Sequence, residues 1–426
     1  MKILQLIVFF CFSLSSLHSA AVANIPADIH LPALDIHSLH QEDVFSEKLG
    51  NAPRFAVERA VDIDPKNQNS WIKENGIWKW RLRVKADQAV SLNFSFTEFK
   101  MSANSKLAIY SADLKQKMRE FSSADNNIHN ELWTPVIMSD DVIIELSAPT
   151  EEIDKLQARL TQINQGYRTF SQPTEKSGAC NVDVVCSEGD DWREEIDSVG
   201  VISTGGSTFC TGFMVNNTSN DRSPYFMTAK HCRINASSAP SLVVYWNYQA
   251  SQCGGGRDGD LNQFNTGSEF LAGSSKSDFT LVKLLKKPDP SWNVSYAGFD
   301  ARDLDAAQAV AIHHPSTDEK SISFEYDPVT VTSYLGTDIP GNGSHIRVED
   351  WDVGTTEPGS SGSPLFNNER RVIGQLHGGY ASCSSQTADW YGRLNTSWEG
   401  EGAPETRLKD WLDPDKTGVL FTDTIR

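Results

Sequence analysis

The stretch PYFMTAKHC, residues 224–232, is a short apolar run that ends in a histidine beside a cysteine. Many short strands separated by polar turns are typical of an antiparallel β-barrel or sandwich. Similar runs recur between turns rich in Gly, Asn, Asp and Ser, at SLVVYWNYQ (241–249), DFTLVKLL (278–285), AVAIHHP (309–315) and RRVIGQLHGG (370–379). From Cys180 onward, the only helical pattern is ETRLKDWLD (405–413), near the C-terminus. We therefore predict an all-β domain with a short C-terminal helix.

A region without cysteine, from residue 24 to 176, precedes this domain. Residues 78–101 and 135–149 alternate apolar and polar side chains, which predicts strands. TEEIDKLQARLTQI (150–163) has the pattern of a short amphipathic helix. Residues 164–179 have the composition of a linker. The pattern predicts a small, mainly-β domain joined to the rest by an exposed linker.

The first 23 residues read as a secretory signal peptide. Lys2 supplies the positive charge, Ile3–Leu17 the apolar core and Ala21–Ala23 the small residues of a cleavage site. The apolar run is shorter than the roughly 20 residues that a membrane span needs. We therefore predict a secreted, extracellular protein without a membrane anchor, with retention in a periplasm as the alternative.

Charge and cysteine content fit an exported protein. The formal net charge of -18 repels phosphate groups and argues against a nucleic-acid partner. Apart from Cys11 in the signal peptide, all six cysteines lie in the C-terminal part, and an even number in an exported chain indicates disulfides. Metal binding is the alternative, but the paired CxxC spacing of a zinc site is missing.

The stretch EPGSSGSP, residues 357–364, presents Ser361 between small residues. A serine becomes a nucleophile only when a base takes its proton and a third group orients that base. A chain without bulky side chains at this place also lets the backbone N–H groups of Gly359 and Ser361 point at a developing oxyanion. Ser361 is therefore a candidate nucleophile.

Two earlier residues complete the set. His231 ends the strand at 224–232 and is the candidate base, and Asp278 opens the strand at 278–285 and is the candidate orienting group. Each is more often structural when taken alone. In the order His–Asp–Ser, one of the known chain orders for this chemistry, they indicate a catalytic triad. The pair His313-His314 lacks further ligands at useful spacing, so we predict a structural role and no metal site.

These residues and their surroundings resemble the bacterial lysyl endopeptidases, which are chymotrypsin-like serine proteases. The resemblance runs from about Ser177 to the C-terminus. It rests on CNVDVVC, CTGFMVNNTSNDR, TAKHC, VVYWNYQ, SDFTL, AIHHP, TEPGSSGSP, GQLHGG and LKDWLDP. It implies a double antiparallel β-barrel over residues 177–426, with the triad between the barrels. It also implies three disulfides, namely Cys180–Cys383, Cys186–Cys253 and Cys210–Cys232.

The resemblance also implies a specificity site. Trypsin-like enzymes carry the acid that reads Lys or Arg six residues before the nucleophile, where this chain has Thr355. In lysyl endopeptidases the acid follows the nucleophile, on a strand at the far wall of the pocket, and Asp389 in CSSQTADWYGR matches it. The family also stacks an aromatic ring on a histidine near the triad. His377 matches the histidine, and Tyr334 stands where relatives have Trp.

The N-terminal domain, residues 24–176, then resembles a propeptide that assists folding and blocks the enzyme. Cleavage after Lys176, before Ser177, would release the mature enzyme by its own specificity. The alternative is that another protease cuts an exposed linker lysine.

Together, these features predict a secreted serine endopeptidase that cuts on the C-terminal side of lysine. We expect protein and peptide substrates, a monomer, and no dependence on calcium or a cofactor. A broader Lys/Arg protease is one alternative. A catalytically inactive homologue used for binding is another.

Overall fold

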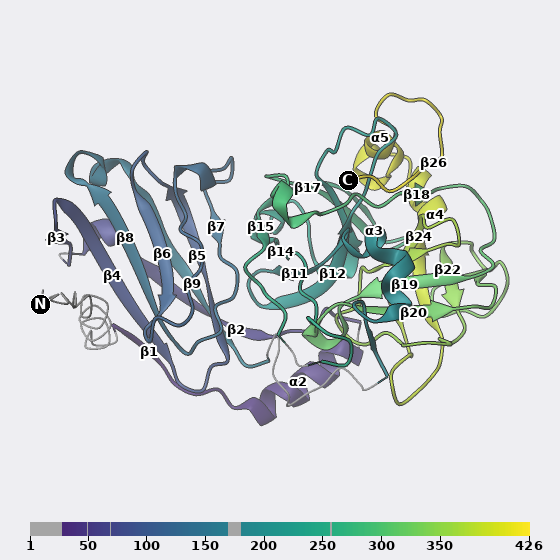
Figure 1. The fold of residues 1–426 in the computed structure, drawn as a ribbon, viewed down its shortest axis with the longest axis horizontal. Coiled ribbons are helices and arrows are strands. Elements are labelled where there is room, and N and C mark those ends of the chain that lie inside the picture. Colours follow the sequence, from purple (N-terminus) through teal and green to yellow (C-terminus); the bar gives the residue numbers. More distant parts are fainter. Residues whose placement is uncertain (1–27, 49, 69, 169–179, 256–257) are drawn as a thin grey trace, which may run out of the picture.

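The computed structural model describes residues 28–48, 50–68, 70–168, 180–255 and 258–426. They form two β-rich units, one purple and blue and the other teal to yellow in Figure 1. The predicted signal peptide and the predicted cleavage position after Lys176 lie outside the described residues. Within the described ranges, none of the helices combines the length and apolar character that crossing a membrane requires.

The N-terminal unit is a sandwich of two sheets. The first sheet has the order β1-β4-β8-β6, with β3 beside β4, and the second has the order β2-β9-β5-β7. The strands of the first sheet are β1 (Ile29–Leu31), β3 (Ile72–Glu74), β4 (Ile77–Ala86), β6 (Lys106–Ser111) and β8 (Asp141–Pro149). Those of the second are β2 (Ala56–Ile63), β5 (Ser91–Lys100), β7 (Leu132–Trp133) and β9 (Gln157–Gly166).

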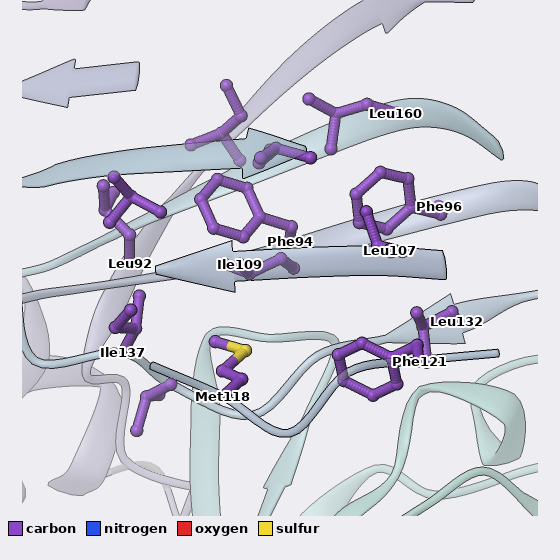
Figure 2. Packing of buried hydrophobic residues seen from close by; sticks show 14 of the residues in the cluster. Leu92, Phe94, Phe96, Leu107, Ile109, Met118, Phe121, Leu132, Ile137 and Leu160 are labelled. Atoms are coloured by element: carbon purple, nitrogen blue, oxygen red, sulfur yellow. The ribbon is translucent and has the colours of Figure 1, made fainter. Parts of the chain in front are cut away.

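The inner faces of the two sheets share one hydrophobic core. Figure 2 shows Phe94 and Phe96 of β5 packed with Leu107 and Ile109 of β6. The predicted alternation holds in β4, where every second residue from Trp80 to Ala86 is buried and the residues between them are half-buried. The mainly-β prediction for this region is therefore confirmed.

The predicted helix over residues 150–163 is wrong. Thr150–Lys155 form a 3-10 helix, and residues 157–163 belong to β9, which pairs with both β2 and β5. Ala158, Leu160 and Ile163 of β9 are buried in the core. Pairing on both edges and core packing outweigh the helix propensity of this segment, because tertiary contacts override a weak local preference. The longest helix of the described ranges, α2 (Ile36–Lys48), was not predicted.

The C-terminal unit is built on two further sheets. The order of the first is β15-β14-β11-β12-β13-β17-β16, and all its pairs are antiparallel. Its strands are β11 (Val199–Thr204), β12 (Thr208–Met214), β13 (Tyr225–Ala229), β14 (Val243–Tyr245), β15 (Phe264–Thr266), β16 (Ser268–Ser274) and β17 (Phe279–Leu284).

The second sheet of this unit has the order β10-β20-β19-β23-β24-β25-β22-β21, with β18 paired to β24 and β26 paired to β18. Its strands are β10 (Val182–Asp183), β18 (Phe299–Asp300), β19 (Ala309–His313), β20 (Ser321–Glu325), β21 (Thr330–Thr332), β22 (His345–Val348), β23 (Pro364–Phe366), β24 (Val372–Gly379), β25 (Asp389–Arg393) and β26 (Phe421–Thr422). Its pairs are antiparallel except that between β18 and β24.

Apolar side chains from both sheets form one core, with Phe213, Met227 and Leu281 from the first and Ile312 and Phe366 from the second. The helices of this unit are short, as predicted: α3 (Arg193–Ile196), α4 (Leu394–Glu399) and α5 (Lys409–Leu412). Two antiparallel sheets around a shared core are the chymotrypsin-like architecture, so the predicted fold class is confirmed. Other short 3-10 helices are Pro65–Asn67, Ser123–Asp125, Ser187–Trp192, Lys230–Cys232, Ala239–Ser241, Pro290–Trp292, Pro315–Thr317 and Pro404–Thr406.

Three disulfides connect the C-terminal unit. They join the pairs that the resemblance implies, Cys180–Cys383, Cys186–Cys253 and Cys210–Cys232. The last bridge links β12 to the residue that follows His231. It therefore fixes the end of β13 against its neighbouring strand.

Candidate active site

Strand register brings His231 and Asp278 together. β13 and β17 are antiparallel neighbours, and Ala229 at the end of β13 pairs with Phe279 at the start of β17. His231 follows shortly after β13, and Asp278 lies directly before β17. Both residues therefore lie at the same end of the same strand pair.

Asp278 holds His231 by two hydrogen bonds. The Nδ1 atom of His231 lies 2.7 Å from Oδ2 of Asp278, and the His231 backbone N–H donates to Oδ1 at 3.0 Å. The Asp278 carbonyl oxygen accepts from the Lys230 N–H at 2.8 Å. With Nδ1 carrying a proton toward the carboxylate, Nε2 of His231 is left as the acceptor, which is the tautomer that a general base needs.

Asp278 has an unusual backbone conformation. Its φ is +54°, in the left-handed region, which residues other than glycine rarely occupy although Asp tolerates it better than most. Only 4% of its surface is exposed. The buried contacts that hold this conformation are those that orient His231, so the local strain lies where the site needs a fixed geometry.

The loop with Ser361 approaches from the second sheet, directly before β23. The Thr211 N–H of β12 donates to the Ser361 carbonyl oxygen at 2.9 Å, and the Gly362 N–H donates to the Leu376 carbonyl at 2.8 Å. The sulfur of Cys232 lies 3.9 Å from the same Ser361 oxygen. The loop is therefore held from both sheets, next to the residue that follows His231.

Glycine is required at two positions of this loop. Gly359 has φ +100°, and a Cβ there would lie 2.3 Å from the Phe209 ring. Gly362 has φ +82°, and a Cβ there would lie 2.2 Å from Oγ1 of Thr228. Any larger residue would have to displace the loop from β12 or β13.

The amides of the loop fall into two groups. The N–H groups of Ser360, Gly362 and Ser363 donate to backbone carbonyls. The N–H groups of Gly359 and Ser361 have no acceptor among the described residues. They are the two donors that the sequence assigns to an oxyanion.

Behind Asp278, His377 of β24 is stacked on Tyr334. The ring centroids of this pair lie 3.6 Å apart with an interplanar angle of 7°. Nε2 of His377 lies 3.7 Å from Oδ2 of Asp278, and its ring is also stacked on His231 at 5.6 Å. Tyr334 thus supplies the aromatic ring that lies against His377 in this structure.

Sequence reasoning did not find His345, which completes this cluster. Nε2 of His345 lies 2.9 Å from Nδ1 of His377, and Nδ1 of His345 lies 2.7 Å from Oγ of Ser344. β25 lies between β22 and β24, and its Gly392 pairs with both His345 and Gln375. Only this strand order places His345 beside His377. A lone histidine at a strand start carries no sequence signal for it.

Asp389 opens β25, the strand between β22 and β24. It is 2% exposed, and its Oδ2 accepts from the Thr356 hydroxyl at 2.6 Å and from Nε1 of Trp351 at 2.9 Å. Its Oδ1 lies 2.3 Å from where a Cβ of Gly379 would be, so the neighbouring strand β24 has room only for glycine at position 379. Burial raises the pKa of the Asp389 carboxyl, and the hydrogen bonds from Thr356 and Trp351 oppose that shift.

Two other residues near this carboxylate have different surroundings. Thr355 is fully buried, and its carbonyl accepts a hydrogen bond from Oγ of Ser323 at 2.8 Å. Glu357 is half-buried, and its Oε2 accepts from Nδ2 of Asn181 at 2.9 Å. Glu357 is thus bonded to the start of the C-terminal unit.

The histidine pair at 313–314 is buried. Nδ1 of His313 lies 2.8 Å from Oγ of Ser360 and Nε2 lies 3.1 Å from Oγ of Ser323, while Nδ1 of His314 lies 3.0 Å from the Asp318 carbonyl. Burial lowers the pKa of His313 to about 3, so it is neutral. His313 therefore connects β20 to the Ser361 loop, the structural role that the sequence predicts.

Among the described residues, two groups of three side chains bring potential metal ligands within 4.8 Å of one another. The first is Cys210, His231 and Cys232, whose sulfurs are joined in a disulfide. The second is His231, Asp278 and His377, in which Oδ2 of Asp278 already faces His231. Both groups belong to the site described above.

The chain is similar to several known proteases. A protein from Pseudomonas aeruginosa strain PAO1 described as lysyl endopeptidase is 28% identical over 306 residues, which are 66% of this chain and 64% of that protein. The chain thus spans slightly less than two thirds of that relative. Solved structures with some similarity include a protease from M. tuberculosis in its active form, with 15% identity and a TM-score of 0.33 over 52% of this chain and 88% of that one. Another is the HtrA-type protease AlgW with a tripeptide, with 15% identity and a TM-score of 0.34 over 49% of this chain and 60% of that one.

The family comparison covers most of the unit that carries the site. The model of the family "Lysyl endopeptidase, C-terminal domain" matches residues 174–392, just over half of the chain. This range includes His231, Asp278, Ser361, His377 and Asp389. The chain therefore belongs to the lysyl endopeptidase family.

Proposed function

We propose that the chain is the precursor of a secreted serine endopeptidase that cuts after lysine. The observation that carries this proposal is the His231–Asp278 pair on the first sheet, met by the Ser361 loop of the second. Ser361 attacks the scissile carbonyl and His231 takes its proton. Asp278 keeps the imidazole in the required tautomer and stabilises the imidazolium that forms. The amides of Gly359 and Ser361 bind the oxyanion.

Asp389 supplies the preference for lysine in this proposal. Its carboxylate is buried and bonded by uncharged donors, so a substrate ammonium that reaches it would find an unmatched negative charge. Burial of a cation is costly unless an anion meets it directly. Physical chemistry favours a basic side chain here, and the family membership favours lysine over arginine.

The N-terminal unit acts as a propeptide that covers the site. Residues 51–55 run along the start of β12, where the Phe209 N–H donates to the Pro53 carbonyl at 3.0 Å and the Phe55 N–H donates to the Ser207 carbonyl at 2.8 Å. The Phe209 ring lies where a Cβ of Gly359 would be. The segment therefore pairs with the start of β12, at residues that β13 does not pair with, and we expect a bound peptide to need this space beside the oxyanion amides.

A turn of the protease unit fixes this cover in place. Gly206, between β11 and β12, sits on β5 and β9, and its carbonyl accepts from Nδ2 of Asn93 at 2.9 Å. A Cβ at Gly206 would lie 2.2 Å from Nδ2 of Asn164. Polar side chains on the outer face of the sandwich thus contact the protease unit. Polar contacts suit an N-terminal unit that must dissociate after cleavage.

The direct test is production of the full chain beside its Ser361→Ala variant. The wild type should mature, react with a serine-directed fluorophosphonate and cut a denatured protein mixture after lysine, as read by mass spectrometry of the peptides. The Ser361→Ala chain should do none of these and should stay uncut when produced alone. Cleavage after arginine as often as after lysine would indicate a broader Lys/Arg protease. A wild type that does not react with the fluorophosphonate would indicate a catalytically inactive homologue.

The propeptide role has a matched pair of variants. Gly206→Ala should weaken the hold of the N-terminal unit, because the methyl group meets Asn164, and the cleaved unit should dissociate roughly tenfold faster or more. Gly205→Ala is the control, since Gly205 also has a positive φ of +62° but its nearest neighbour for a Cβ is 3.8 Å away. Equal dissociation rates for the two variants would contradict this docking.

A further inference from the structure

A chain of polar contacts leads from the start of β22 to the carboxylate of Asp278. Oγ of Ser344 lies 2.7 Å from Nδ1 of His345, and Nε2 of His345 lies 2.9 Å from Nδ1 of His377. Nε2 of His377 lies 3.7 Å from Oδ2 of Asp278. That last separation is too long for a hydrogen bond, so the contact between the two groups is electrostatic.

Two proton arrangements satisfy the hydrogen bonds of this chain. In the first, Ser344 donates to His345, His345 donates to His377, and His377 carries its proton on Nε2. In the second, every donor and acceptor is reversed, and His377 turns the lone pair of Nε2 toward Asp278. A lone pair opposite a carboxylate is repulsive, whereas an N–H dipole is attractive. The charge of Asp278 therefore selects the first arrangement.

Both histidines of the chain are neutral at ordinary pH. Burial lowers the pKa of His345 to about 4, and burial likewise lowers the pKa of His377 to about 4. A neutral imidazole has one donor and one acceptor nitrogen, so its tautomer is set by what its partners offer. For His377 the partner that offers a proton is His345, which is 2% exposed and held in place on β22.

We propose that His345 is a positioning residue that holds His377 in its Nε2-protonated form, with the N–H directed at Asp278. His345 touches neither the substrate nor His231 in this role. It acts through His377, whose dipole stabilises the carboxylate that orients the base. The inference rests on the proposed triad for its effect on rate, but the tautomer of His377 is independent of activity.

The first measurement is nitrogen NMR of imidazole groups in the full chain carrying Ser361→Ala and labelled with ¹⁵N-histidine. Comparison with the same chain carrying His377→Gln assigns the His377 signals. We expect His377 with its proton on Nε2 and an unprotonated Nδ1. A proton on Nδ1 of His377 would overturn the proposal, whether or not the wild-type chain proves to be an active protease.

The second measurement compares two variants that differ in one donor. His345→Leu removes the N–H that faces His377, whereas the amide of His345→Gln can still donate to Nδ1. We expect His345→Leu to lower kcat by about three- to tenfold with little change in KM, the worth of one hydrogen bond to the site. His345→Gln should recover most of that loss and keep the His377 tautomer.

Thermal unfolding of the same proteins separates this role from a packing effect. Equal losses in the Leu and Gln variants, or a loss that follows their unfolding temperatures, would reduce His345 to a structural residue. If His345→Leu does not fold, the spectra of the Ser361→Ala chain with and without His345→Gln still decide, because the proposal requires the Nε2 proton of His377 in both.

Discussion

The C-terminal unit buries two aspartates near one serine loop, and their surroundings differ. Asp278 is 4% exposed and faces His231 and His377, two groups that can carry a proton or direct an N–H at it. Asp389 is 2% exposed and is bonded by the hydroxyl of Thr356 and the indole of Trp351. Among the described residues, no lysine, arginine or histidine forms an ion pair with Asp389.

This difference separates the two tasks that the site is proposed to perform. A carboxylate beside an imidazole has its counter-charge within the protein, because the imidazolium forms during the reaction. A carboxylate that has only neutral donors keeps its charge without a partner, at the cost that burial imposes. We infer that Asp278 orients the catalytic base and that Asp389 binds a cationic side chain of the substrate.

The largest effect should come from Asp278→Asn. The amide cannot hold His231 in the tautomer that leaves Nε2 free, so kcat should fall by roughly four orders of magnitude. The preference for lysyl over uncharged substrates should remain in the residual activity, because Asp389 is untouched. Steady-state kinetics on matched peptide esters would show this. A loss of lysine preference in Asp278→Asn would break the division between the two carboxylates.

Asp389→Asn should give the complementary result. Loss of one partner of a buried ion pair costs roughly 3–5 kcal/mol, so kcat/KM on lysyl esters should fall by about two to three orders of magnitude. The reaction of Ser361 with a small fluorophosphonate should survive, because the reagent does not enter through a lysine side chain. If labelling and lysyl cleavage fall together, Asp389 supports the fold of the site rather than its specificity.

Glu357→Gln is the matched control, since Glu357 is the other acid next to the loop. It is half-buried and already accepts from Asn181, and glutamine can keep that bond through its oxygen. We expect less than a tenfold change in kcat/KM for lysyl esters, in line with a partly exposed charge. A larger loss than in Asp389→Asn would move the specificity role to Glu357.

The smallest effect concerns stability against pH. Burial raises the pKa of Asp389 in the folded state, so the unfolded chain gives up this proton at lower pH than the folded chain does. Its contribution to stability is therefore full below the ordinary carboxyl range and is lost as pH rises through the raised value. In a Ser361→Ala background, Asp389→Asn should remove that loss, as measured by urea unfolding at several pH values. Parallel curves for the two proteins would contradict a raised pKa.

The sequence was sufficient to predict the features that depend on local strand patterns and on short motifs. Alternation in 78–101 and the short runs after residue 224 predicted both β units, and the motifs around His231, Asp278 and Ser361 predicted which strand ends would meet. The helix predicted for residues 150–163 was wrong. The apolar spacing of this segment fits a helix, and only its pairing with β2 and β5 makes most of it a strand. Propensity says nothing about such partners.

The rest of the site depends on contacts between distant segments. His345 lies beside His377 only because β25 separates their strands, and the side-chain donors of Asp389, Thr356 and Trp351, both come from the segment between β22 and β23. The Gly206 turn contacts Asn93 and Asn164 and so joins the two units. Neither sequence contains a pattern that predicts this contact. Register and docking of this kind are fixed by packing, which a single sequence does not display.

The Cys180–Cys383 bridge has a consequence for how latency would end. It ties the first described residue of the C-terminal unit to the segment just before Asp389, and Asn181 is bonded to Glu357 beside it. We expect a cut at the predicted position to leave Cys180 fixed by this bridge, so that activation does not require Cys180 to move. Activation would then require only the departure of the N-terminal unit, while the C-terminal unit keeps its conformation. The lag between cleavage and full activity would measure that departure alone.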